Sequence, residues 1–219
     1  MKVLLIGATG LTGSYVLDLL LQNERVSQVI VWGRSETGKK NPKLKEVLVD
    51  FKSPIELASF PEVDVVICCL GTTIKKAGSQ EAFWKTDVDI PERLAIAAKQ
   101  KNVSAFILQS SVGAAAGSSN FYLRCKGELE DKITQLNFIS SASFRPSLLL
   151  GPRKEQRILE QISKGIMVSF SFFFFGPLAR YKAIPAEHVA RAMVQFAIHP
   201  MEGNLVFEHS EIQRLSDLL

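Results

Sequence analysis

The sequence predicts an α/β fold, a doubly wound parallel sheet with helices on both faces. Short apolar runs rich in β-branched residues recur along the chain, and helix-length patterns separate most of them. The runs are apolar throughout rather than alternating, which is typical of parallel strands buried on both faces. Strands that alternate with helices many times are typical of crossover connections between parallel neighbours.

The individual elements follow from this alternation. We expect strands, each bounded by glycine, proline or charged residues, over residues 2–7, 28–33, 46–50, 63–70, 104–110 and 138–144. We expect helices over residues 11–23, 79–101, 120–136 and 185–198, with a short, weak one near 54–59. After Pro146 the alternation fades into residues 153–164, a phenylalanine-rich stretch and a short tail. We therefore expect one domain over residues 1–219, with a small C-terminal substrate-binding portion, in which residues 146–219 contribute most of the substrate-side elements.

Composition and charge narrow the class of protein. A chain of 219 residues can bury a substantial core, and its 47% hydrophobic and 22% charged residues are typical of a globular protein. The net charge of +4 is too small to indicate a nucleic-acid partner by itself. Cys68 and Cys69 stand together in an apolar run, which favours buried thiols in a reducing compartment over disulfides. The N-terminal apolar run is too short for a signal peptide, so we expect a cytoplasmic enzyme.

The sequence GATGLTG lies directly between the first expected strand and the first expected helix. Glycine there permits a sharp turn and lets the backbone approach a phosphate, which the N-terminus of the following helix attracts. The GxxGxxG spacing is a specific signal because a strand precedes it and an amphipathic helix follows it. A plain strand–helix turn is the alternative. The motif predicts a Rossmann-like fold with a dinucleotide held by Gly7, Thr9, Gly10, Leu11, Thr12 and Gly13.

The end of the second strand bears on the choice of dinucleotide. NAD-binding proteins place an acidic residue near this point to bind the ribose 2′-hydroxyl. Here Arg34 follows Gly33, and a guanidinium suits the 2′-phosphate of NADP(H). Glu36 is close, however, and a solvated surface arginine is the alternative. We expect NADP(H) to be preferred, with NAD(H) as the second cofactor. Asp50 and Phe51 close the third strand and are expected beside the adenine, unless Asp50 is an exposed turn residue.

Six short motifs occur in order: GATGLTG, GR at 33–34, CCLGTT at 68–73, QSS at 109–111, YLRCK at 122–126 and FRPS at 144–147. From residue 2 to about 200 the chain resembles the atypical short-chain dehydrogenase/reductases of the NAD(P)-binding Rossmann superfamily, closest to the Tat-interacting-protein-like oxidoreductase group. The resemblance implies a nicotinamide cofactor and a catalytic set of Ser111, Tyr122 and Lys126. It also implies cofactor contacts from Leu70, Gly71, Thr72, Thr73, Lys126 and Pro146.

The residues of the catalytic set also support this chemistry on physical grounds. Tyr122 and Lys126 lie one helical turn apart on one face. A phenol, with an ordinary pKa of about 10, exchanges protons poorly at neutral pH unless a nearby cation such as Lys126 favours the phenolate. Ser111 is expected to hydrogen-bond the substrate carbonyl. Ser110 is the alternative serine, and a loop in which both serines bond their own backbone is the other interpretation.

Two departures from the family pattern matter. Many family enzymes carry an asparagine on the helix before the fifth strand, where it supports a proton-relay water. That helix here contains Thr86, Asp87 and Asp89 but no asparagine, so a complete relay is not expected. The chain is also shorter than the sugar-nucleotide members, which favours simple carbonyl reduction over epimerisation.

Other features have competing interpretations. The stretch SFSFFFFG at 169–176 is too short for a transmembrane helix and is expected as core or pocket wall, with a subunit interface or membrane contact as alternatives. The basic loop around residues 39–40 is expected to be solvated surface with some attraction for phosphate. His188 is expected to be structural, and His199 and His209 lack metal-ligand spacing, so no metal site is expected.

The sequence therefore predicts an NADP(H)-dependent oxidoreductase that transfers a hydride to or from a small or hydrophobic carbonyl or alcohol. No nucleic-acid partner and no membrane span are expected, and a homodimer is compatible with the chain. The alternative function is a dinucleotide-binding regulator or scaffold with little catalytic activity. An intact Ser111–Tyr122–Lys126 set favours the enzyme, because a pure sensor needs only the glycine loop and the ribose contacts.

Overall fold

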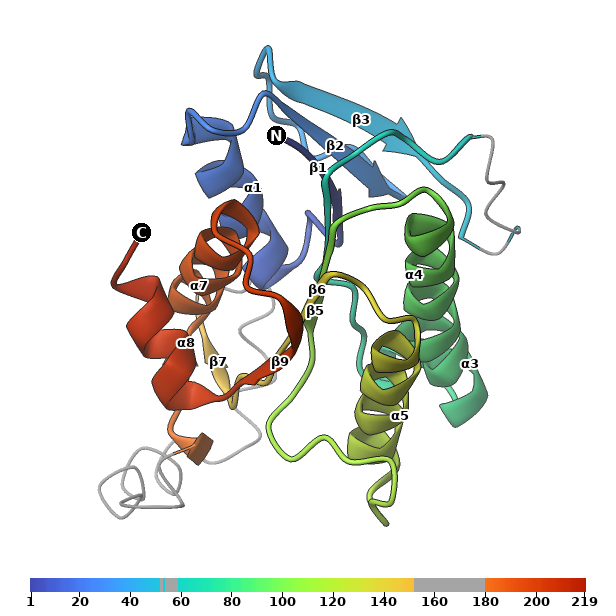
Figure 1. Ribbon diagram of the computed structural model, residues 1–219. Coiled ribbons are helices and arrows are strands. Elements are labelled where there is room, and N and C mark those ends of the chain that lie inside the picture. The colour runs from blue at the N-terminus through green and yellow to red at the C-terminus, as the bar shows by residue number, and fades with distance from the viewer. Residues whose placement is uncertain (52, 54–58, 152–179) are drawn as a thin grey trace.

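The computed structural model describes residues 1–51, 53, 59–151 and 180–219, and the described part contains a seven-stranded sheet (Figure 1). The strand order is β3-β2-β1-β4-β5-β6-β9, and every neighbouring pair is parallel. The strands are β1 Lys2–Ile6, β2 Gln28–Gly33, β3 Leu44–Leu48, β4 Val65–Cys68, β5 Ala105–Gln109, β6 Ser140–Phe144 and β9 Gly203–Phe207. Two short strands, β7 Leu149–Leu150 and β8 Ile184–Pro185, pair separately. The predicted Rossmann-like class is confirmed.

Helices cover both faces of the sheet (Figure 1). One layer contains α1 Leu11–Gln22, α7 Ala186–Ile198 and α8 His209–Ser216, in which α7 packs against both of the others. The other layer contains α3 Gln80–Trp84, the π-helix η2 Lys85–Asp89, α4 Ile90–Gln100 and α5 Phe121–Gln135. A short helix, α2 Ile74–Ala77, follows β4. No helix in these described ranges is long and apolar enough to cross a membrane.

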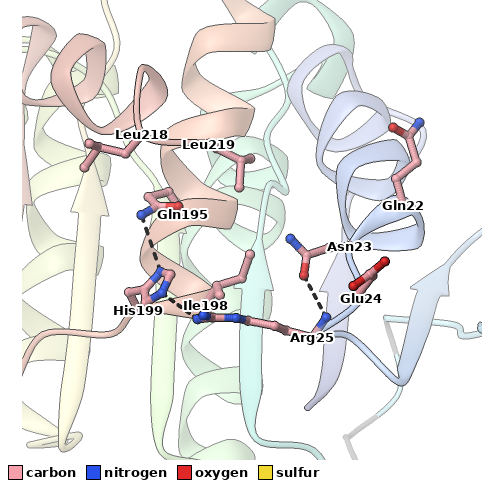
Figure 2. A pocket seen from close by; sticks show the side chains of 9 residues that line it. All are labelled: Gln22, Asn23, Glu24, Arg25, Gln195, Ile198, His199, Leu218 and Leu219. Carbon is pink, nitrogen blue, oxygen red and sulfur yellow. Dashed lines mark hydrogen bonds between the residues drawn. The ribbon is translucent and has the colours of Figure 1, made fainter.

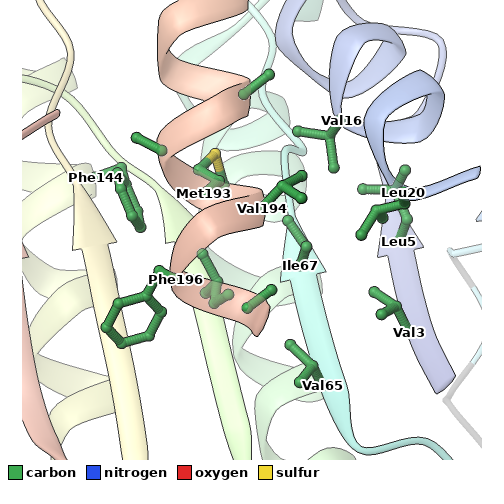
Figure 3. Packing of buried hydrophobic residues seen from close by; sticks show 14 of the residues in the cluster. Val3, Leu5, Val16, Leu20, Val65, Ile67, Phe144, Met193, Val194 and Phe196 are labelled. Carbon is green, nitrogen blue, oxygen red and sulfur yellow. The ribbon is translucent and has the colours of Figure 1, made fainter. Parts of the chain in front are cut away.

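The sheet has a hydrophobic core on each of its two faces, which accounts for the apolar sequences of its strands. Val3 and Leu5 of β1 pack into the layer of α1 and α7 (Figure 3), whereas Leu4 and Ile6 pack into the layer of α4 and α5. Successive side chains of a strand point to opposite faces, so a strand buried on both sides carries apolar residues toward both cores. The sheet is thereby fixed between the two helical layers, and the loops at its ends are left for binding.

The structure differs from the sequence prediction at the last strand and in the long helix before β5. Residues 203–207 form a seventh strand, β9, which pairs in parallel with β6, where only a short tail was expected. The helix expected over 79–101 is divided into α3, η2 and α4. The expected core or pocket wall at 169–176 and the pattern at 153–164 lie outside the described residues, as does most of the weak helix near 54–59.

The cysteines agree with the expectation of thiols rather than disulfides. Cys68 and Cys125 are buried, Cys69 is half-buried, and all three are free.

Candidate functional site

The predicted site residues gather at one edge of the sheet. All seven strands are parallel, so the loops that follow them meet at the carboxyl edge. The strand order reverses direction between β1 and β4, which are hydrogen-bonded neighbours. In open α/β sheets, ligands bind outside the carboxyl ends of the strands at such a switch point. The glycine loop after β1 and the loop Leu70–Thr73 after β4 lie on either side of it.

The glycine loop has backbone geometry that excludes side chains at two positions. Gly7 has a φ of +84°, and a Cβ there would lie 2.6 Å from the backbone of Cys69. A Cβ on Gly13 would lie 2.1 Å from the carbonyl oxygen of Gly7. These two glycines therefore allow the turn after β1 and the close packing of α1 against it.

Gly10 differs from the other two glycines because it is exposed. A Cβ at this position would meet only the Gly7 carbonyl oxygen, at 3.2 Å. Gly10 is the N-cap of α1 and supplies no side-chain cap, so the first N–H groups of the helix remain available for a ligand. Thr12 Oγ1 is buried and has no hydrogen-bond partner among the residues that the structure describes. An open helix N-terminus with an unpartnered hydroxyl beside it fits the pyrophosphate of a dinucleotide.

The predicted adenosine contacts lie at the ends of β2 and β3. The two ends are joined by the hydrogen bond from the Val49 N–H to the Gly33 carbonyl oxygen at 2.9 Å, so Arg34 and Asp50 follow neighbouring strands. Both side chains are exposed. Phe51 is buried, and Arg93 of α4 donates to its carbonyl oxygen at 2.7 Å. Arg93 thus holds the chain after β3 in place, a function that its position in a helical pattern did not reveal.

The loop after β4 is tied to the helices on the same side of the sheet. The Thr72 N–H donates to Asp87 Oδ2 at 2.9 Å, and the Thr73 hydroxyl accepts from the Lys76 N–H at the start of α2. A Cβ on Gly71 would lie 3.9 Å from Lys126 Nζ. Lys126, which was expected to contact the cofactor, is therefore beside the loop expected to do the same.

Lys126 forms an ion pair with Asp87 inside the protein. The Nζ–Oδ1 distance is 3.0 Å, and the side chains of Lys126 and Asp87 are 5% and 0% exposed. Burial alone would lower the pKa of Lys126, but Asp87, together with Tyr122 and Cys68, raises it. Burial raises the pKa of Asp87, and Lys126 and the Thr72 N–H oppose this rise. The lysine is held as an ammonium group at the carboxyl edge of the sheet.

Tyr122 is half-buried on α5, one turn before Lys126, as predicted. Its ring packs edge-on against Phe83 with a centroid distance of 5.8 Å, and Lys126 Nζ lies 5.9 Å from the Tyr122 ring centroid. Asn120 caps the helix by accepting from the Leu123 N–H, so Tyr122 falls in the first turn. The cap and Phe83 restrict the position of the phenol beside the lysine.

The serines follow β5. Ser111 Oγ makes one long hydrogen bond, 3.5 Å to the Val112 carbonyl oxygen, and remains half-buried. Ser110 Oγ is buried and unpartnered within the described ranges. The Val112 N–H donates to the Pro146 carbonyl oxygen at 2.9 Å, so the serine loop and Pro146, an expected cofactor contact, lie together. Which serine acts on a substrate stays a prediction.

The serine loop packs tightly on the helix that carries Tyr122 and Lys126. A Cβ on Gly127 would lie 2.2 Å from the backbone of Ala115 and Ala116. The Ala115 N–H also donates to the carbonyl oxygen of Leu123 at 3.2 Å. Gly127 follows Lys126 directly, and sequence reasoning missed it because a lone glycine inside a helical pattern usually indicates only a weak position. Its contact joins the serine loop to α5.

His188 and His199 have partners away from the tyrosine–lysine pair. His188 Nδ1 is 3.1 Å from Gln213 Oε1. His199 Nε2 accepts from Arg25 Nη1 at 2.5 Å in a cavity of about 410 Å³ between the ends of α1 and α7 (Figure 2). Arg25 also accepts a hydrogen bond from the amino group of Met1, which places the cavity at the start of β1, the edge opposite to the glycine loop. In the described part of the chain, no group of three or more His, Cys, Asp or Glu residues could hold a metal ion.

The fold and the glycine loop define a dinucleotide-binding α/β protein. Residues 3–205 match the NAD dependent epimerase/dehydratase family. The chain belongs to this family, and the resemblance to NAD(P)-binding Rossmann proteins is confirmed.

Relatives agree with this assignment, and solved structures share the fold. The chain is 36% identical to Protein HTATIP2 of Rattus norvegicus over 212 residues, which cover 93% of this chain and 84% of the relative. It is 33% identical to Protein FMP52, mitochondrial, of Meyerozyma guilliermondii over 209 residues, 93% of this chain and 88% of the relative. The fold is similar to that of MoeE5 in complex with UDP-glucose and NAD, with a TM-score of 0.71, 16% identity, and coverage of 100% of this chain and 82% of MoeE5. It is also similar to the Bordetella bronchiseptica enzyme WbmH in complex with NAD⁺, with a TM-score of 0.69, 19% identity, and coverage of 99% and 79%.

These names correct one expectation. Relatives from Meyerozyma guilliermondii, Candida albicans and Aspergillus niger are all named as mitochondrial proteins. The expectation of a cytoplasmic enzyme, which was based on the short N-terminal apolar run, is therefore contradicted.

Proposed function

We propose that this protein is an NADP(H)-dependent oxidoreductase that transfers a hydride to or from a small or hydrophobic carbonyl or alcohol substrate. The observation that carries the proposal is the position of Tyr122 and Lys126. They lie one turn apart on α5, and Lys126 reaches the loop after β4 at the switch point of the sheet. Membership of a family described as NAD dependent supports a nicotinamide cofactor.

The residues present fit such a cofactor. Gly10 and the N-terminus of α1 would hold the pyrophosphate, with the Thr12 hydroxyl as a further donor. The loop Leu70–Thr73, Lys126 and Pro146 would contact the nicotinamide side, and Asp50 and Phe51 the adenine side. The cofactor supplies or accepts the hydride when it is bound.

The chain's own residues would manage the proton and the developing charge. Reduction of a carbonyl leaves an alkoxide, and Tyr122 would donate the proton that the alkoxide needs. The ammonium group of Lys126 would stabilise the resulting phenolate by its charge. Ser111 would donate a hydrogen bond to the carbonyl oxygen as negative charge develops there. In alcohol oxidation the same groups would act in reverse.

The preference for NADP(H) is supported by Arg34. It follows β2, where an acidic residue would otherwise bind the ribose 2′-hydroxyl, and its guanidinium is exposed and able to reach a phosphate. For the location of the protein, the names of the fungal relatives favour mitochondria.

The proposal is tested with the full-length protein. Mass spectrometry of the dinucleotide released from purified protein should identify NADP(H), and calorimetry should give tighter binding of NADPH than of NADH. A panel of small aldehydes, ketones and quinones is then screened for NADPH oxidation. Binding of dinucleotide without turnover across the panel and the matching alcohols would contradict the enzyme and favour the regulator.

A further inference from the structure

The π-helix η2 contains an aspartate, Asp87, whose side chain lies inside the protein. The N–H of Ile90 donates to the carbonyl oxygen of Lys85, five residues earlier, and this wider turn contains Asp87. Asp87 is fully buried, while Lys85 is exposed. Single π-turns inside helices frequently occur at functional sites, since they redirect a side chain without ending the helix.

Asp87 uses both carboxylate oxygens to join separate elements. Oδ1 accepts from Lys126 of α5, and Oδ2 accepts from the Thr72 N–H of the loop after β4. A Cβ on Gly71 would lie 3.5 Å from Asp87 Oδ1, so the loop backbone packs directly over the ion pair. One buried carboxylate therefore connects η2, the helix of the tyrosine–lysine pair and the loop expected to hold the nicotinamide side of the cofactor.

A buried lysine without a counter-charge tends to lose its proton, because burial penalises the charged form. The groups that interact with Lys126 are Asp87 from η2, Tyr122 from α5 and Cys68 from β4. Burial raises the pKa of the Cys68 thiol to about 11, so it is neutral at physiological pH. Of these three groups, Asp87 is the carboxyl, and it accepts a hydrogen bond from Lys126 Nζ at 3.0 Å.

We propose that Asp87 is a positioning residue for Lys126: its carboxylate holds the ammonium group beside Tyr122 and ties it to the loop after β4 through the Thr72 N–H. The catalytic role of the positioned lysine rests on the proposed function, whereas the ion pair is seen in the structure itself. An asparagine at residue 87 would keep the shape and the hydrogen bond to Thr72 but would lack the charge. The carboxylate thus maintains a charged lysine even before a cofactor binds.

The direct test is a titration of Lys126 in the full-length, cofactor-free protein. Lysine is labelled with ¹³C and ¹⁵N, and the Lys126 side-chain signals are identified by their loss in Lys126→Arg. In the unsubstituted protein we expect Lys126 to titrate above the ordinary lysine pKa of about 10.4. In Asp87→Asn we expect Lys126 to titrate at a lower pH than in the unsubstituted protein, because the opposite charge beside it is gone.

Asp89→Asn is the matched control, because it removes the same charge from the same π-helix, two residues away. It should leave the Lys126 titration unchanged. Equal titration in Asp87→Asn and the unsubstituted protein would overturn the proposal. Should Asp87→Asn fail to fold, the unsubstituted protein still decides, because a Lys126 that titrates below an ordinary lysine contradicts the role of Asp87.

A second readout separates positioning from simple support of the fold. Once a substrate is found, turnover of Asp87→Asn should fall off at lower pH than turnover of the unsubstituted protein, by the same shift that the titration gives. A profile that loses height without moving would mean that Asp87 only stabilises the fold, and it would overturn the positioning role. If Lys126 shifts as expected but Tyr122→Phe keeps full turnover, the ion pair stands and the proposed hydride-transfer mechanism fails.

Discussion

Lys126 Nζ lies 3.0 Å from Asp87 Oδ1, and both side chains are almost completely shielded from solvent. Removing one partner of a buried ion pair leaves the other charge without compensation. The pair therefore links the stability of the fold to the chemistry of the candidate site, because the same lysine stands beside Tyr122.

We predict that Lys126→Met destabilises the protein in a pH-dependent way. At about pH 8 the free energy of unfolding should fall by about 3–5 kcal/mol, because Asp87 is left buried and charged. Burial raises the pKa of Asp87, and removal of Lys126 removes an opposing influence. A carboxyl with a raised folded pKa stabilises the fold when protonated, and that contribution disappears as the pH rises through the folded pKa.

The destabilisation should therefore be smaller at about pH 5 than at about pH 8 in denaturant unfolding. Lys132→Met on the same helix is the control, since Lys132 pairs with Glu92 at 2.6 Å but is 34% exposed. The free energy of unfolding of Lys132→Met should fall by no more than about 1 kcal/mol. If Lys126→Met is destabilised by the same amount at both pH values, a buried and charged Asp87 is contradicted.

Gly10→Val should abolish dinucleotide binding while the protein still folds. A Cβ on Gly10 meets only the Gly7 carbonyl oxygen, at 3.2 Å, but a valine there would cover the exposed backbone that the pyrophosphate must approach. Gly13→Val is the contrast, because its Cβ would lie 2.1 Å from that same oxygen and folding itself should fail. Circular dichroism and calorimetry check both variants, and unchanged affinity in a folded Gly10→Val would refute the phosphate site.

Arg34→Ala should weaken NADPH binding by roughly ten- to a hundredfold and leave NADH binding almost unchanged. A hydrogen bond between charged groups contributes about 1.5–3 kcal/mol, which corresponds to that range of affinity. Lys101→Ala removes the same charge from an exposed position after α4, before β5 begins, and should affect neither cofactor. Equal losses for NADPH and NADH in Arg34→Ala would show that Arg34 does not bind the 2′-phosphate.

Gly127→Ala should displace the serine loop from α5. The added methyl would come within 2.2 Å of the backbone at Ala115 and Ala116, and overpacking of this kind typically costs about 1–3 kcal/mol. Gly117→Ala in the same loop is the control, because its Cβ would meet nothing within 4 Å. Thermal unfolding should separate the two variants, and equal melting temperatures would contradict the close packing of loop and helix.

The buried strands were predictable because their sequence pattern reflects their environment. β1, β2, β4 and β5 are covered on both faces, and their buried positions are therefore apolar. β6 is buried along its whole length too, but its sequence SSASF fills three of its five positions with small serines. β9 was missed because it lies at the edge of the sheet, where Phe207 is its one buried side chain. Its sequence GNLVF has no apolar periodicity, and its pairing with β6 depends on contacts between segments far apart in the chain.

The candidate site was predictable from motifs only in part. The glycine loop and the spacing of Tyr122 and Lys126 depend on local geometry, which a sequence can show. The role of Asp87 depends on a π-turn, which rotates the helix away from the 3.6-residue period. A period-based interpretation cannot decide whether Asp87 or Asp89 faces inward. The sequence signal in this region was the absence of an asparagine from the helix. The structure shows that Asp87 of the same helix forms a buried ion pair with Lys126.

The central claim is that Tyr122 donates the proton beside a charged Lys126, and steady-state turnover of Tyr122→Phe tests it most directly. The variant loses one hydroxyl from a half-buried side chain, so folding and NADPH affinity should be retained. Tyr15→Phe, in α1 and packed against the other core, is the control for loss of a hydroxyl and should keep normal turnover. With a substrate from the carbonyl panel, the account predicts that turnover of Tyr122→Phe falls by roughly two to four orders of magnitude. Near-normal turnover in a folded, NADPH-binding Tyr122→Phe would contradict it.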